Sequence, residues 1–321
     1  MGKLILSLDG GGIRGAATTQ FLYRIEEKLK KEYKLSIRDC VDFYAGTSTG
    51  SIIAIALATT KLSMNEINNL YNPKNAKKIF LKNKGWFEID GINAPKYESE
   101  GKLNMLKSTF GDINFGDTEE NKHILAVTYS IKERKPLVIK STDPNHTKLK
   151  SYDVADASSA APTYFPTKRM EINNEELWLI DGGVTANNPT MCAIVEAKKV
   201  WKEPLNELRV LSIGTGYKAR EIDGSESRSW GVLEWFSKGQ ILGVLSDERI
   251  VDYQVRTILE KDNYLRVNCR MNREEGLIEP PDDSMDNIDE NNIQKLKSMG
   301  NFWFEKDGER AISLLIKNRK S

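Results

Sequence analysis

Short apolar runs alternate with stretches of helical periodicity along most of this chain, and no other feature restricts its fold as strongly. Residues 3–8 form a short apolar run that ends in Asp9 and three glycines, as expected for a buried strand followed by a turn. Over residues 16–32, apolar side chains recur at helical spacing, with charged side chains on the opposite face. The chain therefore begins as a strand, a tight turn and a helix.

The same succession continues to the C-terminal end of the chain. Further strands are expected at residues 40–45, 123–131, 137–140, 177–180, 208–213 and 264–268. Further helices are expected at residues 52–60, 190–201 and 291–317. Alternation of this kind predicts an α/β fold with a mostly parallel central sheet sandwiched by helices. We find no repeat or low-complexity linker, so we expect a single domain over residues 1–321 with a helical C-terminal extension.

The composition narrows the classes of function. The 47 Lys and Arg residues nearly balance the 46 Asp and Glu residues, so we expect no nucleic-acid polymer as a partner. The longest apolar run, residues 52–58, is too short to cross a bilayer, and the N-terminal residues do not form a signal peptide. Cys40, Cys192 and Cys269 are scattered and lack metal-ligand spacing. We therefore expect a cytoplasmic protein without a structural metal.

The segment Gly46-Thr47-Ser48-Thr49-Gly50 matches the G-x-S-x-G pattern of a nucleophile elbow. It follows a predicted strand and opens a predicted helix, which is the context that such an elbow requires. Gly46 and Gly50 would allow the sharp turn and keep bulk away from the Ser48 hydroxyl. The alternative is that Ser48 only caps a helix in a glycine-rich turn. The motif makes Ser48 a candidate nucleophile without excluding that alternative.

A nucleophilic serine needs a base, and this chain has only two histidines. His123 starts a predicted strand, and His146 lies in a polar loop where we expect it to be solvated. A triad of Ser48, Asp117 and His146 is formally allowed, but no motif supports it. A carboxylate is therefore the expected base if Ser48 is catalytic.

Asp181 is the candidate carboxylate, because it ends an apolar strand and precedes Gly182 and Gly183. At the edge of a sheet it would be partly desolvated, which raises the pKa of a carboxyl group and makes it a better base near neutral pH. The alternative is an Asp-Gly turn, which is common. Position alone does not decide between the two.

A third motif, Asp9-Gly10-Gly11-Gly12-Ile13-Arg14-Gly15, lies at another predicted strand–helix junction. Consecutive glycines let backbone N–H groups converge on an anion, as an oxyanion hole requires. The competing interpretation is a loop that holds the phosphate of a nucleotide. Arg14 within the motif, and the lack of an acidic residue after a clear second strand, weaken that interpretation.

These three motifs, in this order, resemble the patatin-like phospholipase family. Residues 157–166 (ASSAAPTYFP) and Asn187-Asn188-Pro189 resemble further signatures of the same family. The resemblance covers residues 4–215 and is looser over residues 216–321. It implies the family's α/β fold and a cytoplasmic enzyme that contacts the membrane surface to cleave fatty-acyl esters of phospholipids.

The resemblance also implies a mechanism. Ser48 would attack the ester carbonyl and Asp181 would take its proton, in a Ser–Asp dyad that works through an acyl-enzyme without metal or cofactor. Gly11 and Gly12, with Gly10 as a further contributor, would form the oxyanion hole, and Arg14 would support it.

A narrower resemblance links this short chain to bacterial patatin-like effectors of anti-phage signalling, in which a cyclic dinucleotide activates phospholipid degradation. The alternatives are a constitutive lipid hydrolase, an acyltransferase that uses Ser48, and a ligand-binding module without chemistry. Residues 230–245 are rich in Trp, Leu and Ile, and suit an interfacial helix or lid. These residues are equally compatible with a helix that packs in the core, or with a dimer-forming helix that would make the protein a homo-oligomer.

Overall fold

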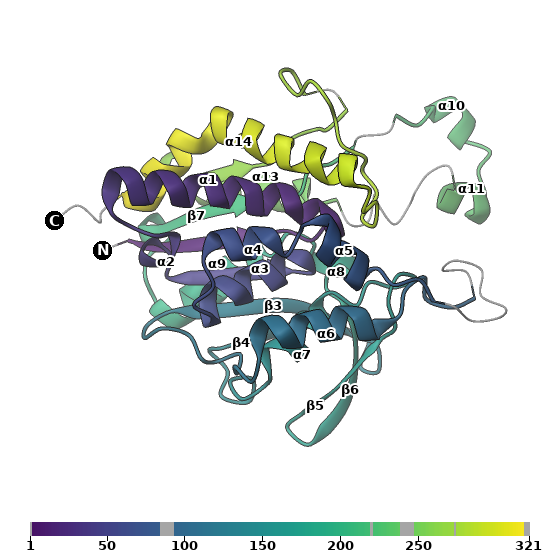
Figure 1. Ribbon diagram of the computed structural model, residues 1–321, viewed down its shortest axis with the longest axis horizontal. Coiled ribbons are helices and arrows are strands. Elements are labelled where there is room, and N and C mark those ends of the chain that lie inside the picture. Colours follow the sequence, from purple (N-terminus) through teal and green to yellow (C-terminus); the bar gives the residue numbers. More distant parts are fainter. Residues whose placement is uncertain (1, 84–92, 219–220, 238–246, 273, 318–321) are drawn as a thin grey trace.

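A twisted sheet with helices on both faces forms the centre of the protein. The computed structural model describes residues 2–83, 93–218, 221–237, 247–272 and 274–317, and Figure 1 shows their arrangement. In this part of the chain the sheet has eight strands, in the order β5-β6-β3-β2-β1-β7-β8, with β4 paired to β3. The strands are β1 Lys3–Leu8, β2 Phe43–Thr47, β3 His123–Ser130, β4 Lys135–Lys140, β5 Lys168–Ile172, β6 Glu175–Asp181, β7 Leu208–Ile213 and β8 Tyr264–Val267.

Most of the sheet is parallel, which confirms the fold class expected from the sequence. β1 pairs in parallel with β2 and β7, and further parallel pairings join β2 to β3 and β7 to β8. β4 and β6 run antiparallel to β3, and β5 runs antiparallel to β6. The ends of the central parallel strands therefore meet at one edge of the sheet, where ligands bind in open α/β folds.

Two apolar cores lie on opposite faces of the sheet. Leu4, Leu6 and Leu8 of β1 point into one core and Ile5 into the other, as the two-residue period of a strand requires. The helices that pack on the first core are α1 Gly15–Tyr33, α2 Ile37–Cys40, α3 Thr49–Thr59, α4 Met64–Asn69, α5 Pro73–Ile79, α6 Ser99–Phe110, α7 Ser151–Ser158 and α14 Glu290–Ile316. Those on the second core are α9 Thr190–Trp201 and α13 Arg249–Ile258.

The expected C-terminal helix is α14, which runs along α1 (Figure 1). Gly300 makes this close packing feasible, because a Cβ atom there would lie 2.5 Å from the carbonyl oxygen of Ala17. Trp303, one turn further on, is buried in the first core. Short helices α8 Gly183–Ala186, α10 Gly224–Ser227 and α11 Val232–Ser237 complete the described α-helices. Among the described residues, no helix combines the length and apolar character needed to span a bilayer.

One expected strand is displaced. Residues 40–45 were expected to form a strand, but Cys40 ends helix α2 and the strand starts at Phe43. The cause is a capping box: the Ser36 hydroxyl accepts the Asp39 N–H, and the Asp39 carboxylate accepts the Ser36 N–H. This local signal starts a helical turn before the apolar run becomes extended.

Candidate active site

Ser48 lies at the tight turn between β2 and α3. Its backbone has φ 54° and ψ −126°, a left-handed φ that non-glycine residues rarely adopt. The turn packs against β1 so closely that a Cβ atom on Gly50 would lie 2.1 Å from the carbonyl oxygen of Leu8. A Cβ atom on Gly46 would lie 2.4 Å from the Gly50 carbonyl oxygen. This is the strained strand–turn–helix geometry that exposes the side chain of a nucleophile at the edge of a sheet.

Hydrogen bonds hold the strained turn in place. The Ser48 N–H donates to the Ser158 hydroxyl at 3.0 Å, and that hydroxyl donates to the Val127 carbonyl at 2.7 Å. The Ser48 carbonyl accepts both the N–H and the hydroxyl of Ser51, at 2.9 and 2.6 Å. Ser48 does not cap α3 with its side chain, so its hydroxyl is free for another partner. The N-terminal end of α3 also favours negative charge at this point.

The partner of the Ser48 hydroxyl is the carboxylate of Asp181. The two residues meet because β2 and β6 both pair with β3, even though β6 runs antiparallel to β3. Thr47 of β2 pairs with Val127, and Asp181 of β6 pairs with the next residue of β3, Thr128. The last residue of β6 therefore arrives at the point where β2 ends and the turn at Ser48 begins.

The environment of Asp181 makes it a basic carboxylate. Burial raises its pKa from 3.8 to about 6, against hydrogen bonds from the Ser48 hydroxyl and the Gly183 N–H and the positive charge of Lys102. The Gly183 N–H lies 2.7 Å from Oδ1. Such a group is ionised at neutral pH and is still able to accept a proton.

The glycine motif forms a loop opposite Ser48. Within the described residues, the N–H groups of Gly11 and Gly12 have no acceptor, whereas Gly10 donates its N–H to the Asn187 carbonyl at 3.1 Å. The expectation that Gly10 contributes to an oxyanion hole is therefore corrected, because a neighbouring chain segment occupies its N–H. Gly12 has φ +59°, and a Cβ atom there would lie 2.2 Å from the Met285 carbonyl oxygen. Only glycine fits at this position.

Arg14 braces the same loop from within. Its guanidinium donates to the Gly11 carbonyl at 3.3 Å and to the Gly216 carbonyl at 3.0 Å. Burial lowers the pKa of Arg14, and the charge of Glu248 acts in the opposite direction. The guanidinium thus ties the glycine loop to the segment that follows β7.

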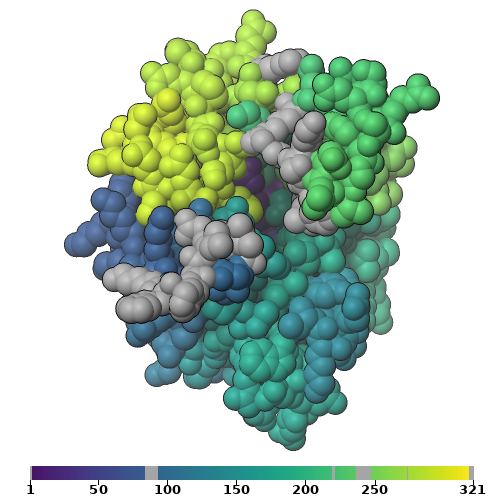
Figure 2. All heavy atoms as spheres, turned by 90° about the vertical axis from the view of Figure 1, so that its right-hand side faces the viewer, coloured from purple at the N-terminus to yellow at the C-terminus, as the bar shows by residue number. Residues whose placement is uncertain are grey.

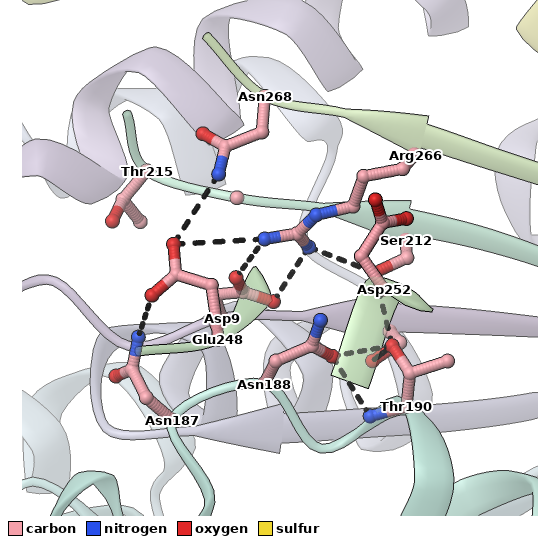
Figure 3. Close-up of polar contacts among 12 residues, drawn as sticks. Asp9, Asn187, Asn188, Thr190, Ser212, Thr215, Glu248, Asp252, Arg266 and Asn268 are labelled. Atoms are coloured by element: carbon pink, nitrogen blue, oxygen red, sulfur yellow. Dashed lines mark hydrogen bonds and ion pairs between the residues drawn. The ribbon is translucent and has the colours of Figure 1, made fainter. Parts of the chain in front are cut away.

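A buried polar network holds the start of the glycine loop (Figure 3). Arg266, on β8, donates to Asp9 Oδ1 at 2.9 Å and to the Ser212 hydroxyl at 2.8 Å, and it also pairs with Asp9 Oδ2. Glu248 lies 3.7 Å from the same guanidinium and accepts the side-chain amides of Asn187 and Asn268, each at 3.3 Å. The loop is therefore anchored from β8 and from Glu248, the residue that precedes α13.

A pocket of about 830 Å³ opens over these groups. Figure 2 shows the hollow between the yellow C-terminal segment and the teal middle of the chain, with purple N-terminal residues at its base. Ser48, Asp181, Gly11, Gly12 and Arg14 line it together. Apolar side chains supply much of the remaining wall, among them Ile52, Leu70, Phe80, Met105, Phe165 and Val184. The volume and lining are typical of a site for a small, largely apolar ligand.

Neither histidine lines this pocket. His123 packs against Phe43 and Trp201, with ring centroids 5.8 Å apart in each pair. His146 is buried and not solvated, which corrects the expectation from its polar loop: its Nδ1 accepts the Lys140 N–H at 3.2 Å. Both imidazoles have local structural contacts outside the pocket, and the titratable group hydrogen-bonded to the Ser48 hydroxyl is the carboxylate of Asp181.

A comparison with known protein families shows which family the chain belongs to. The model of the patatin-like phospholipases matches residues 6–194, which include all three motifs. The chain belongs to the patatin-like phospholipase family. Membership of this family implies a lipid acyl hydrolase activity.

Similar proteins in the family include several from plants. Patatin-like protein 2 of Arabidopsis thaliana is 29% identical over 306 residues, which cover 82% of this chain and 74% of the relative. A potato (Solanum tuberosum) protein named "Probable inactive patatin-3-Kuras 1" is 26% identical over 295 residues, covering 82% of this chain and 77% of the relative. The crystal structure of VipD from Legionella pneumophila aligns with a TM-score of 0.44 at 13% identity, over 94% of this chain and 67% of that one.

Several residues around the site were not found from the sequence. Lys102 lines the pocket from α6, a helix that the periodicity did not reveal. Ser158 lies in the stretch 157–166, which resembles a family signature, but that resemblance does not reveal that its hydroxyl accepts the Ser48 N–H. Arg266 is a charged residue in an apolar strand, and that contrast is a signal that sequence reasoning could have used.

The aromatic stretch after residue 229 is described only in part. Val232 and Leu233 of α11 are 72% and 80% exposed, and the rings of Trp230 and Trp235 meet edge to face at 5.4 Å. Residues 238–246, which contain the rest of the expected interfacial helix, lie outside the described residues. No cluster of three or more His, Cys, Asp or Glu side chains suited to a metal is found in the described part of the chain.

Proposed function

We propose that this protein is a serine acyl hydrolase that cleaves fatty-acyl esters of membrane phospholipids with Ser48 as nucleophile and Asp181 as base. One observation carries the proposal: the hydroxyl at a strained strand–turn–helix is hydrogen-bonded to a buried carboxylate with a raised pKa, at the base of an apolar pocket. Membership of a lipid acyl hydrolase family supports the same assignment.

In the first half-reaction, the Ser48 oxygen forms a bond to the ester carbonyl carbon while its proton passes to Asp181. The tetrahedral intermediate then collapses, the bond to the leaving alkoxide breaks, and the proton on Asp181 passes to that oxygen. An acyl-enzyme and a lysophospholipid result. In the second half-reaction a water molecule gives its proton to Asp181, attacks the acyl carbon and releases the fatty acid, and the proton returns to Ser48.

The charge that develops on the carbonyl oxygen would be stabilised by the N–H groups of Gly11 and Gly12, which lack acceptors in the described structure. Arg14 and Asn187 keep the loop that carries them in position. Removal of one donor from such a hole typically lowers kcat by roughly 10²–10³ fold. The loop therefore supplies the electrostatic part of the mechanism, and the Ser–Asp dyad supplies the proton transfer.

The substrate would reach the pocket from a lipid surface. The apolar wall fits an acyl chain, and exposed Val232 and Leu233 on α11 suit contact with the membrane interface. Activation by a cyclic dinucleotide in anti-phage defence remains a prediction from the narrower resemblance of the sequence.

The decisive assay measures free fatty acid released from mixed phospholipid vesicles, with and without a panel of cyclic dinucleotides. We expect release by the wild-type protein and loss of release in Ser48→Ala and Asp181→Asn, both with wild-type circular dichroism. His146→Ala is the control, because His146 lies outside the pocket and its loss would leave the rate per folded molecule unchanged.

Three results would contradict the proposal in different ways. No release under any condition favours a ligand-binding module without chemistry. Transfer of the acyl group to an added alcohol in preference to water favours an acyltransferase that uses the same serine. A large loss in folded His146→Ala would refute the dyad.

A further inference from the structure

One short segment accepts hydrogen bonds from the backbone N–H groups of both Ser48 and Asp181. The segment is the C-terminal end of α7, residues 158–160. The Ser158 hydroxyl accepts the Ser48 N–H at 3.0 Å, and the Ala160 carbonyl accepts the Asp181 N–H at 3.0 Å. A shift of this helix end would therefore move the nucleophile and the base relative to each other.

Lys102 of α6 holds the end of α7. Its ammonium donates to the Ser159 carbonyl at 2.9 Å, to the Asp156 carbonyl at 3.2 Å and to the Ser159 hydroxyl at 3.2 Å. It also pairs with the Asp156 carboxylate at 3.1 Å, and only 3% of the Lys102 side chain is exposed. Carbonyl groups at the C-terminal end of a helix lack intrahelical donors and favour a cation. Lys102 thus caps α7 from a neighbouring helix.

The same ammonium faces the dyad. Lys102 lines the pocket together with Asp181, and its charge acts on the Asp181 carboxylate against the effect of burial. Burial lowers the pKa of Lys102 itself, and the charges of Asp156 and Asp181 oppose that effect. Lys168 of β5 is the second cation beside Asp156, at 3.1 Å from its Oδ2, and it also pairs with Asp153 at 2.6 Å.

We propose that Lys102 is a positioning residue of the dyad: it caps the helix end that orients Ser48 and Asp181, and its positive charge stabilises the Asp181 carboxylate. The inference rests on the proposed function, because it assigns a role relative to Ser48 and Asp181 as catalytic groups. It adds a lysine that none of the sequence motifs contains. Loss of the charge would make Asp181 harder to ionise, so catalysis would need a higher pH.

The test is the pH dependence of kcat/KM for a soluble fatty-acyl ester, measured on the full chain. Lys102→Gln removes the charge but keeps a hydrogen-bond donor, and Lys102→Arg keeps the charge. For Lys102→Gln we expect the acidic limb to move up by roughly one pH unit, a shift at the low end for a nearby opposite charge. We express activity at each pH as a fraction of the same protein's plateau activity. This fraction would be about fivefold lower in Lys102→Gln than in wild type at pH 6, and nearly the same in both at pH 8. Lys102→Arg would keep its acidic limb close to that of the wild type.

Lys168→Met is the matched control, because it removes the other cation from the Asp156 carboxylate without removing the charge that lines the pocket. We expect its acidic limb to stay at the wild-type pH. Lower plateau activity in Lys102→Gln, as a fall in kcat with KM unchanged, would report the contribution of the cap.

Two results would overturn the inference. One is an unchanged acidic limb in folded Lys102→Gln, and the other is failure of Lys102→Gln to fold, which would make the lysine a structural residue. Failure of the proposed function itself is distinguishable: Ser48→Ala or Asp181→Asn would then retain wild-type turnover of the same ester.

Discussion

Replacement of Arg266 by methionine would test how the glycine loop is held. Asp9 is completely buried, and the carboxylate receives both of its hydrogen bonds from this guanidinium (Figure 3). Burial, with a smaller contribution from the charge of Glu248, raises the pKa of Asp9 from 3.8 to about 7, and the charge and hydrogen bonds of Arg266 prevent a larger rise. Methionine fills similar volume but leaves the carboxylate unpaired, with the negative charge of Glu248 still nearby.

The cost to folding stability follows from the proton equilibrium of Asp9. An unpaired buried carboxylate takes up a proton. Because the wild-type carboxyl already titrates near pH 7, each pH unit above that value costs the variant about 1.4 kcal/mol of folding free energy relative to wild type. The pH-dependent penalty is therefore up to about 3 kcal/mol at pH 9 and close to zero at pH 5. The first value lies at the low end of the range of roughly 3–5 kcal/mol for breaking a buried ion pair. The sign follows from the raised pKa of Asp9 in the folded variant: stability is recovered as the pH falls.

Urea unfolding at pH 9 and pH 5 measures both values, with Asp9→Asn/Arg266→Met as the control. The double variant carries no buried carboxyl group at position 9, so its stability would fall less between pH 5 and pH 9 than that of Arg266→Met. A deficit below about 1 kcal/mol in Arg266→Met at pH 9, or an equal deficit at pH 9 and pH 5, would refute this account of the network.

Three further predictions concern the pocket and its surroundings. The acidic limb of kcat/KM for a soluble ester would lie near pH 6, because burial raises the pKa of Asp181 to about 6; a limb near pH 4 would contradict the desolvated base. Asp181→Asn would be inactive yet more stable than wild type at pH 8, by up to about 3 kcal/mol in urea unfolding, since a carboxyl with a raised folded pKa loses stability as the pH rises through that value. Equal stability at pH 8 would argue against that penalty. Leu233→Ser with Trp235→Ser would reduce vesicle co-sedimentation but leave soluble-ester turnover unchanged, because both side chains are exposed on α11; Val195→Ser, an exposed apolar residue of α9, is the control, and equal effects of the two would rule out a specific contact.

Much of the fold could be predicted because the signals are local. The apolar run before Asp9 forms β1 over the expected residues, and the periodicity after residue 290 corresponds to α14. α6 and α7 were missed, since their apolar faces are short and interrupted by polar residues such as Lys102 and Asp156. Those side chains are buried in the folded protein, where they pair with each other across two helices.

The sequence by itself determined where a strained turn could form. Two glycines around Ser48, three before Ile13 and two after Asp181 allow tight turns at each strand end, and such local effects act over a few residues. Only the tertiary structure decided which groups meet. The pairing of β3 brings Asp181 of an antiparallel strand to Ser48, Asn187 occupies the N–H of Gly10, and Arg266 neutralises Asp9 across more than 250 residues of chain. These contacts depend on strand order and burial, which no local pattern specifies.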